Sequence, residues 1–156
     1  MGVIRNGRED WVVGFSKRFT HENNNLIEFL VLKEGLNLAL DQNLKPLDIC
    51  IDSMEVINML HHGNSLYNLN IFECKSLLES LGNPPVYHTY REKNRVADWM
   101  AKQDSKLDLF DKLHIFATPP ASVGVVFRED FKGKSFSRVV SNNGNTYPNS
   151  YVFVPD

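Results

Sequence analysis

The stretch PLDICID, residues 46–52, decides how this chain can fold. Apolar and polar side chains alternate along it, and Pro46 and Ser53 bracket it, so we predict a strand. Asp52 ends this strand, at the kind of position where open α/β sheets bind their ligands. Asp52 is therefore a candidate functional residue. A structural alternative is that Asp52 and Ser53 only cap the helix expected next.

The segments on both sides of this strand alternate between strand and helix patterns. In chain order the predicted elements are strands at 2–5 and 10–19, a helix at 23–42, the strand at 46–52, helices at 53–61 and 67–81, a strand at 85–92 and a helix from 93 or 94. This order predicts a mixed sheet flanked by helices in one α/β domain. Pro119-Pro120 marks a boundary. We assign residues 1–118 to the domain and 119–156 to a C-terminal extension, whose last part is a candidate for disorder.

Composition limits the function classes. The 156 residues are 42% hydrophobic and 23% charged, which is typical of one globular domain, and no apolar run is long enough to span a membrane. The net charge of −2 excludes a whole-molecule attraction to nucleic acid, so nucleic-acid binding would need a local patch or metal ions. Cys50 and Cys74 are expected to be buried free thiols. We therefore expect an intracellular protein, in the nucleus or cytoplasm, that is not secreted.

Glu28 is the most informative acid in the predicted 23–42 helix. It lies in line with Leu32 and Ala39, on the side opposite the polar residues of that helix. A carboxylate on the inward stripe has to be paired, protonated or bound to a metal, because an unpaired buried charge is costly. Two structural alternatives remain: access to water at the helix end, or a lysine partner.

A third acid, Asp98, lies in NRVADWMAKQ, residues 94–103. Taken alone it fits helix decoration, because the helix dipole favours an early acid and Lys102 follows at ion-pair spacing. The small residues beside it, Ala97 and Ala101, would allow a close approach. Three converging carboxylates could hold a hard divalent cation at a phosphate, since such cations take oxygen ligands.

Three motifs in order carry a family resemblance: IEFLVLKEGLNLAL (27–40), LDICIDSMEVINML (47–60) and YHTYREKNRVADWMAKQ (87–103). Together they resemble the reverse-transcriptase-like, type I ribonuclease H domains of plants, relatives of the ribonuclease H parts of retroelements. The resemblance covers residues 1 to about 140. It implies a ribonuclease H-like fold that cuts the RNA strand of an RNA–DNA hybrid, with two Mg²⁺ or Mn²⁺ ions held by four carboxylates.

Carried over by motif, the resemblance assigns catalytic and metal-binding roles to Glu28, Asp52 and Asp98. It also implies nucleic-acid contacts from a second set of residues: Ser53, Arg91, Lys93, Asn94 and Arg95. The basic members of that set could equally form a solvated loop. The histidine of the bacterial-type enzymes has no counterpart in the loop REKNR, and His88, which lies earlier in a strand, does not take that role.

A departure from the family concerns its first strand, which precedes GVIR and carries the aspartate that bridges both metals. This sequence begins at Met1-Gly2-Val3. In the resembling fold that strand is central, so the strands at 2–5 and 46–52 are expected to face an empty slot. Three outcomes are open: a truncated relic or an incomplete gene model, distorted closure of the two strands, or a substitute strand, for which NSYVFVPD (149–156) is the candidate.

The functional expectation is a ribonuclease H-like domain whose catalysis is impaired by the absent aspartate. The first alternative is a non-catalytic nucleic-acid-binding module, with salt-dependent binding that needs no Mg²⁺. The second is an interaction domain that captures a partner strand at an exposed strand edge. A monomer is expected, with association through strand edges as the alternative.

Overall fold

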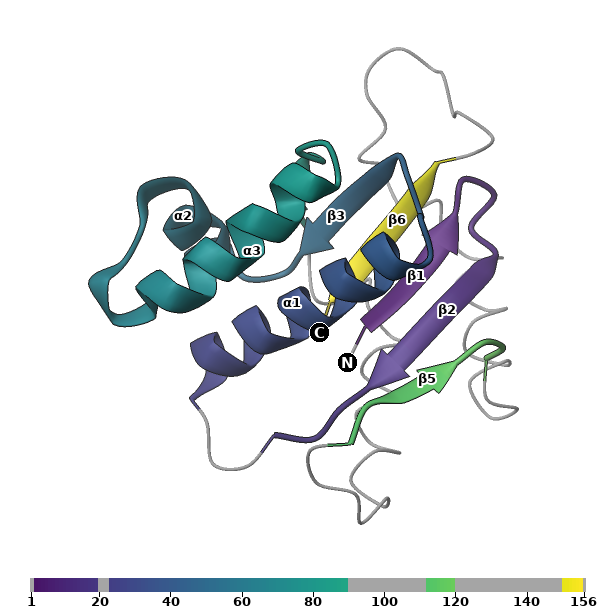
Figure 1. Ribbon diagram of the computed structural model, residues 1–156, viewed down its shortest axis with the longest axis horizontal. Coiled ribbons are helices and arrows are strands. Elements are labelled where there is room, and N and C mark those ends of the chain that lie inside the picture. Colours follow the sequence, from purple (N-terminus) through teal and green to yellow (C-terminus); the bar gives the residue numbers. More distant parts are fainter. Residues whose placement is uncertain (1, 20–22, 90–111, 120–149, 156) are drawn as a thin grey trace.

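The computed structural model describes residues 2–19, 23–89, 112–119 and 150–155 (Figure 1). Within these residues the fold is α/β, with a mixed six-stranded sheet and three α-helices. The predicted fold class is thereby confirmed, and the arrangement is consistent with a ribonuclease H-like fold.

The chain opens with a β-hairpin. β1 (Gly2–Asn6) pairs antiparallel with β2 (Trp11–Ser16). The side chain of Asn6 builds the turn, because its Oδ1 accepts hydrogen bonds from the backbone N–H groups of Arg8 and Asp10, each at 2.9 Å. The predicted hairpin is confirmed, although its second strand ends at Ser16 rather than at residue 19.

The next elements follow the predicted order. They are α1 (Asn24–Asp41), β3 (Leu47–Ile51), α2 (Met54–His62), a 3₁₀ turn (Ser65–Tyr67), α3 (Asn68–Ser80) and β4 (Val86–His88). Asn23 begins α1 as its N-cap, since its side chain accepts a hydrogen bond from the Leu26 N–H at 2.9 Å. A short strand, β5 (His114–Phe116), pairs with β2 at the far edge of the sheet.

The last strand, β6 (Tyr151–Pro155), occupies the centre of the sheet. The strand order is β4-β3-β6-β1-β2-β5, with β6 antiparallel to β1 and parallel to β3. Figure 1 shows it in yellow between these two strands. The expected empty slot is therefore absent from the described sheet, and of the three outcomes the substitute strand is confirmed. Although β6 comes from the segment predicted as an extension, it belongs to the domain's own sheet.

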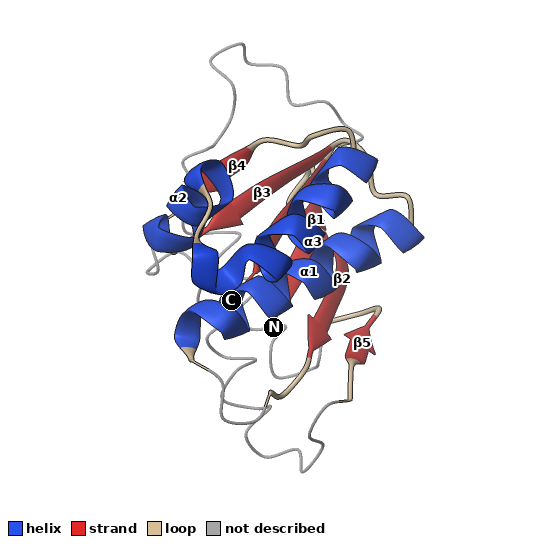
Figure 2. Ribbon diagram, turned by 60° about the vertical axis from the view of Figure 1, so that its left-hand side comes forward, coloured by secondary structure: helices blue, strands red, loops and turns tan. Residues whose placement is uncertain are grey.

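The helices cover one face of the sheet (Figure 2). α1 lies over β6 and β1, and α3 packs against α1. Because α1 has neighbours on both sides, buried residues occur around much of its circumference: Phe29, Val31, Leu32, Gly35, Leu36, Leu38 and Ala39. This helix holds the layers together, and it also carries Glu28.

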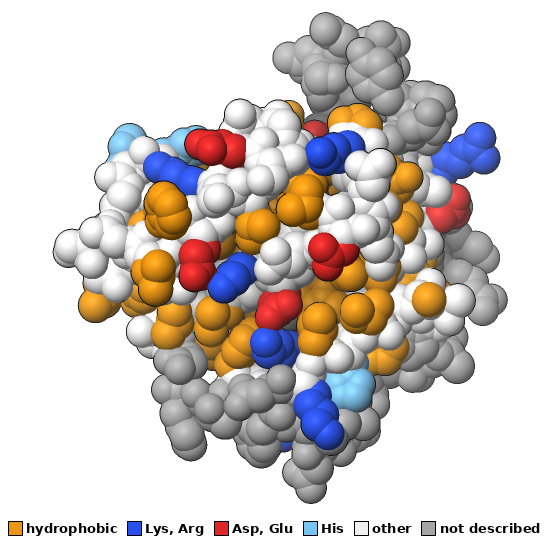
Figure 3. Space-filling view, viewed as in Figure 1, with side chains coloured by type: hydrophobic (Ala, Val, Ile, Leu, Met, Phe, Trp, Pro, Cys, Tyr) orange, Lys and Arg blue, Asp and Glu red, His pale blue; other side chains and the backbone are white. Residues whose placement is uncertain are grey.

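The outer surface of α3 and of the 3₁₀ turn is partly apolar. Leu66, Leu69 and Phe72 are each about 70% exposed or more. The face of the molecule seen in Figure 3 shows hydrophobic side chains interspersed with charges of both signs. Among the described helices, none combines the length and apolar character needed to cross a bilayer.

Candidate active site

Asp52 lies directly after β3, whose neighbours β4 and β6 are both parallel to it. Two hydrogen bonds from the β4 side hold the backbone here. The His88 Nε2–H donates to the Asp52 carbonyl at 3.2 Å, and the Thr89 N–H donates to the Ile51 carbonyl at 2.8 Å. The end of β3 is thus a supported position for a functional side chain. Sequence reasoning set His88 aside and did not find this supporting contact.

The helix cap beside Asp52 comes from Ser53. Its Oγ accepts a hydrogen bond from the Val56 N–H at 3.2 Å, and it is the N-cap of α2. The structural alternative for this dipeptide therefore applies to Ser53, whereas Asp52 lies one residue before the cap. The nucleic-acid contact predicted for Ser53 stays a prediction.

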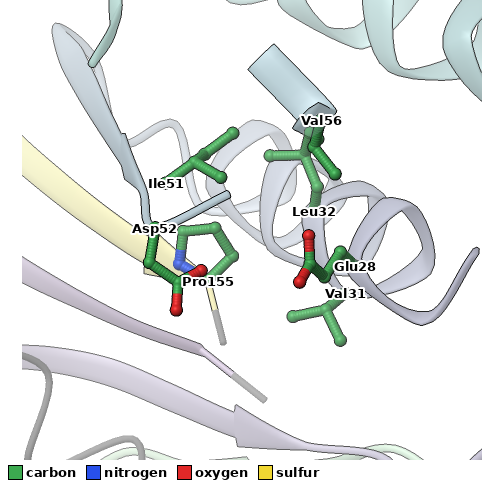
Figure 4. A pocket seen from close by; sticks show the side chains of 7 residues that line it. All are labelled: Glu28, Val31, Leu32, Ile51, Asp52, Val56 and Pro155. Atoms are coloured by element: carbon green, nitrogen blue, oxygen red, sulfur yellow. The ribbon is translucent and has the colours of Figure 1, made fainter. Parts of the chain in front are cut away.

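Glu28 approaches the same place from the helix layer. It lies in the second turn of α1 and is half-buried. Its side chain extends from α1 toward the ends of β3 and β6, where Asp52 and Pro155 lie (Figure 4). The structure thus brings together two of the three predicted catalytic acids.

The two carboxylates line one small pocket with an empty volume of about 250 Å³, its open mouth included. Its other walls are apolar: Val31, Leu32, Ile51, Val56 and Pro155. Apolar walls lower the local dielectric and strengthen the interaction of the carboxylates with a cation. Pro155 was not predicted from the sequence as a site residue, because only the pairing of β6 with β1 and β3 places it in the wall of this pocket.

The donor set of this pocket fits a hard divalent cation, since Mg²⁺ and Mn²⁺ prefer carboxylate oxygens. Two acids are fewer than the four that the family resemblance implies. Among the residues that the structure describes, no group of three or more His, Cys, Asp or Glu residues is placed to hold a metal.

The remaining predicted site residues lie outside the described ranges. These are Asp98, the third predicted catalytic acid, and the predicted nucleic-acid contacts Arg91, Lys93, Asn94 and Arg95.

Two lysines near α1 bear on the alternative that a lysine pairs with Glu28. Lys17 forms an ion pair with Glu34 at 2.8 Å, and Lys33 forms one with Glu73 at 2.9 Å. Both lysines are therefore engaged by other carboxylates.

The two thiols are structural. Cys50 and Cys74 are free and buried, as predicted. Burial raises the pKa of each thiol to about 12, with a further contribution from Asp48 at Cys50 and from Glu73 at Cys74. A thiol with such a pKa stays protonated at neutral pH, so neither cysteine is a nucleophile there.

Comparison with known proteins identifies the family. The profile described as reverse transcriptase-like matches residues 1–104. A protein of Arabidopsis thaliana, provisionally named a ribonuclease H protein, is 27% identical over 142 residues, which cover 89% of this chain and 23% of the relative. The chain thus spans about a quarter of the length of the curated relative it matches. No solved structure matched the chain.

Proposed function

The chain belongs to the reverse transcriptase-like family, and from this premise we propose that it is a ribonuclease H-type domain that hydrolyses the RNA strand of an RNA–DNA hybrid with divalent metal ions. The observation that carries the proposal is the shared pocket of Glu28 and Asp52, two acids that come from different elements. The name of the Arabidopsis relative supports the same activity.

Each polar residue at the pocket has a separate proposed role. Glu28 and Asp52 would hold Mg²⁺ or Mn²⁺, and Asp98 would add a further carboxylate. Bound there, such ions would supply the Lewis-acid chemistry that activates a water toward a phosphodiester and offsets the charge on the leaving oxygen. The His88 bond to the Asp52 carbonyl and the Ser53 cap hold the backbone on both sides of the Asp52 side chain.

Contacts with the nucleic acid come from the segment that follows β4. Arg91, Lys93 and Arg95 bind phosphates, with Asn94 and Ser53 as polar neighbours. Such contacts set affinity without reading the base sequence. Recognition of 2′-hydroxyl groups distinguishes the RNA strand from DNA.

The buried thiols bear on the cellular compartment of the domain, and its sheet edges bear on its oligomeric state. Two buried free cysteines suit the reducing interior of a cell, the nucleus or the cytoplasm. The edge strands of the described sheet, β4 and β5, have only three residues each, which disfavours edge-to-edge association and supports a monomer.

The test is cleavage of an end-labelled RNA–DNA hybrid in Mg²⁺ and in Mn²⁺. Wild type is expected to cut, and Asp52→Asn is expected to lose at least about a hundredfold in rate, because a neutral amide oxygen is a weaker ligand for a divalent cation than a charged carboxylate. Asp48→Asn is the matched control. It makes the same chemical change four residues earlier, in β3, at a residue outside the pocket.

Three results would contradict the proposal. The first is a folded wild type that does not cut, and the second is cutting that survives in EDTA. The third is an equal loss in Asp48→Asn. Salt-dependent binding of the hybrid by a folded but inactive wild type would instead favour the non-catalytic binding module.

A further inference from the structure

Asn6, the last residue of β1, stands directly before Gly7. In an Asn-Gly pair the backbone nitrogen of the glycine attacks the side-chain amide carbon more readily than in other pairs, because glycine has no Cβ to obstruct the approach. The Gly7 nitrogen bonds to Cγ of Asn6, the Cγ–Nδ2 bond breaks, and ammonia leaves with the proton of the Gly7 N–H. Water then opens the succinimide ring to aspartate or isoaspartate, so the sequence carries a deamidation motif at the β1–β2 turn.

In the folded protein the side chain of Asn6 is held at both of its polar atoms. Oδ1 accepts hydrogen bonds from the N–H groups of Arg8 and Asp10, each at 2.9 Å, and Nδ2 donates to Asp10 Oδ2 at 3.3 Å. The backbone is held too, because the Asn6 N–H donates to the Asp10 carbonyl at 3.0 Å and the Asn6 carbonyl accepts from the Glu9 N–H at 2.9 Å. Deamidation makes Cγ tetrahedral and expels Nδ2, so it displaces both side-chain atoms from their bonded positions. The closed turn therefore opposes the reaction.

We propose that Asn6 is a site of spontaneous deamidation which the closed β1–β2 turn protects, and that the product of the reaction weakens this turn. Both products remove a contact of the Asn6 side chain. Aspartate places a carboxylate oxygen where Nδ2 donates to Asp10, so two negative charges oppose each other there. Isoaspartate carries the main chain through the former side chain and adds one methylene to the backbone at the end of β1.

The position of Asn6 extends the effect of this reaction to the centre of the sheet. Asn6 pairs with Tyr151, the first residue of β6. Paired strands need the same spacing of backbone groups, so an extra methylene at residue 6 moves its N–H and carbonyl away from their partners. Deamidation thus acts on both neighbours of β1 at this end, on β2 through the turn and on β6 through the Tyr151 pair.

The experiment is incubation of the 156-residue protein at 37 °C and neutral pH, with and without concentrated urea, followed by peptide mapping with mass spectrometry. A second Asn-Gly pair, Asn143-Gly144, lies outside the described residues and serves as the internal reference in urea. In urea, Asn6 and Asn143 are expected to convert at similar rates, because the dipeptide alone then sets the chemistry. In the folded protein Asn6 is expected to convert at least about tenfold more slowly than in urea, since only molecules with an open turn react.

Two variants connect the protection to the bonds of the turn. Asp10→Ala removes the acceptor of Asn6 Nδ2 and is expected to speed conversion of Asn6 in the folded protein about threefold or more, with no change in urea. Asp41→Ala is the matched control, since it removes an exposed acid at the end of α1, and should convert as wild type does. Asn6→Asp reproduces one product and is expected to lower the thermal midpoint, by less in an Asp10→Ala background, where the opposing charge is absent.

Four results would overturn the inference. If Asn6 of folded wild type converts as fast as in urea or faster, the closed turn gives no protection, and the two N–H donors at Oδ1 assist the reaction instead. If Asn6 stays intact in urea while Asn143 converts, it is not a deamidation site. Conversion of folded Asp10→Ala at the wild-type rate would separate the protection from the turn, and Asn6→Asp melting with wild type would show that the product does not weaken it.

Discussion

The ring of Phe153 lies directly against the backbone of Gly35, so closely that a methyl group on residue 35 would overlap three of its ring atoms. Gly35 follows Glu28 by seven residues, two helical turns, and therefore lies on the same face of α1. The central strand and the helix that carries the candidate acid are thus fitted to each other at one point. This contact determines how closely α1 packs against the sheet.

Gly35→Ala is expected to destabilise the protein by about 1–3 kcal/mol, because the added methyl overpacks the core against Phe153. The sign of this change in the free energy of unfolding is informative. In a helix without this contact, alanine would be more stable than glycine by about 0.5–1 kcal/mol. Urea unfolding at pH 7 measures the change.

Placing Gly35→Ala in a Phe153→Ala background provides the control. With the ring removed, the substitution should become neutral or stabilising. A Gly35→Ala penalty that persists there would show that the ring is not its cause.

Phe153→Ala is expected to lower the free energy of unfolding by about 3–5 kcal/mol, the usual cost of a large cavity at a fully buried aromatic residue. Phe72→Ala is the matched control. Phe72 is 70% exposed, so its loss should change stability by about 0.5 kcal/mol or less. Equal thermal midpoints for the two variants would contradict the central position of β6.

Ser53→Ala is expected to cost about 0.5–2 kcal/mol, because it removes the N-cap of α2, whereas Ser53→Gly should cost only a few tenths. Comparing stability with hybrid affinity separates the two roles of this residue. If Ser53 also contacts nucleic acid, both variants should bind the hybrid more weakly. Unchanged hybrid binding in both would limit Ser53 to the cap.

The thiols are expected to react slowly with Ellman's reagent at pH 8. With a pKa of about 12 instead of 9.0, each holds roughly a thousandfold less thiolate, and burial adds a steric barrier. Their folded-state pKa is raised, so their contribution to stability is complete below pH 9 and is lost as the pH rises toward about 12. Two rapidly reacting thiols in the folded protein would contradict their burial.

Asp48→Asn is expected to raise the melting temperature at pH 7. Burial raises the pKa of the Asp48 carboxyl above 3.8, which means that folding disfavours its ionised form. The contribution of Asp48 to stability is therefore complete below pH 3.8 and lost as the pH rises through the folded-state pKa. The gain in melting temperature should therefore shrink at pH 3.

The local part of the fold was predictable from sequence because local signals specify it. Asn6 makes the hairpin turn, Asn23 caps α1, and the alternation of PLDICID gives β3. Glu28 was a candidate because a carboxylate interrupted an apolar helix stripe, and Asp52 was one because it ended a strand. Both predictions needed only a few neighbouring residues.

The position of β6 required more than local signals. Composition identified YVFVP as strand-forming, but its partners are separated from it by more than 100 residues. Pairing over such a distance depends on which sheet edges remain unpaired after the rest has folded, and no local pattern encodes that. Pro155 in the pocket wall and the His88 support of Asp52 are tertiary contacts of the same kind.

The central place of β6 also imposes an order in time. Tyr151 is made 100 residues after Ile51, the end of β3. At about 5–20 residues per second, the ribosome needs roughly 5–20 s to bridge that interval, during which β1 and β3 each lack their shared neighbour. Unpaired strand edges are where nascent chains misassociate. A nascent chain of this sequence is therefore expected to depend on chaperones until β6 emerges, and to become stable only when β6 has paired with β1 and β3.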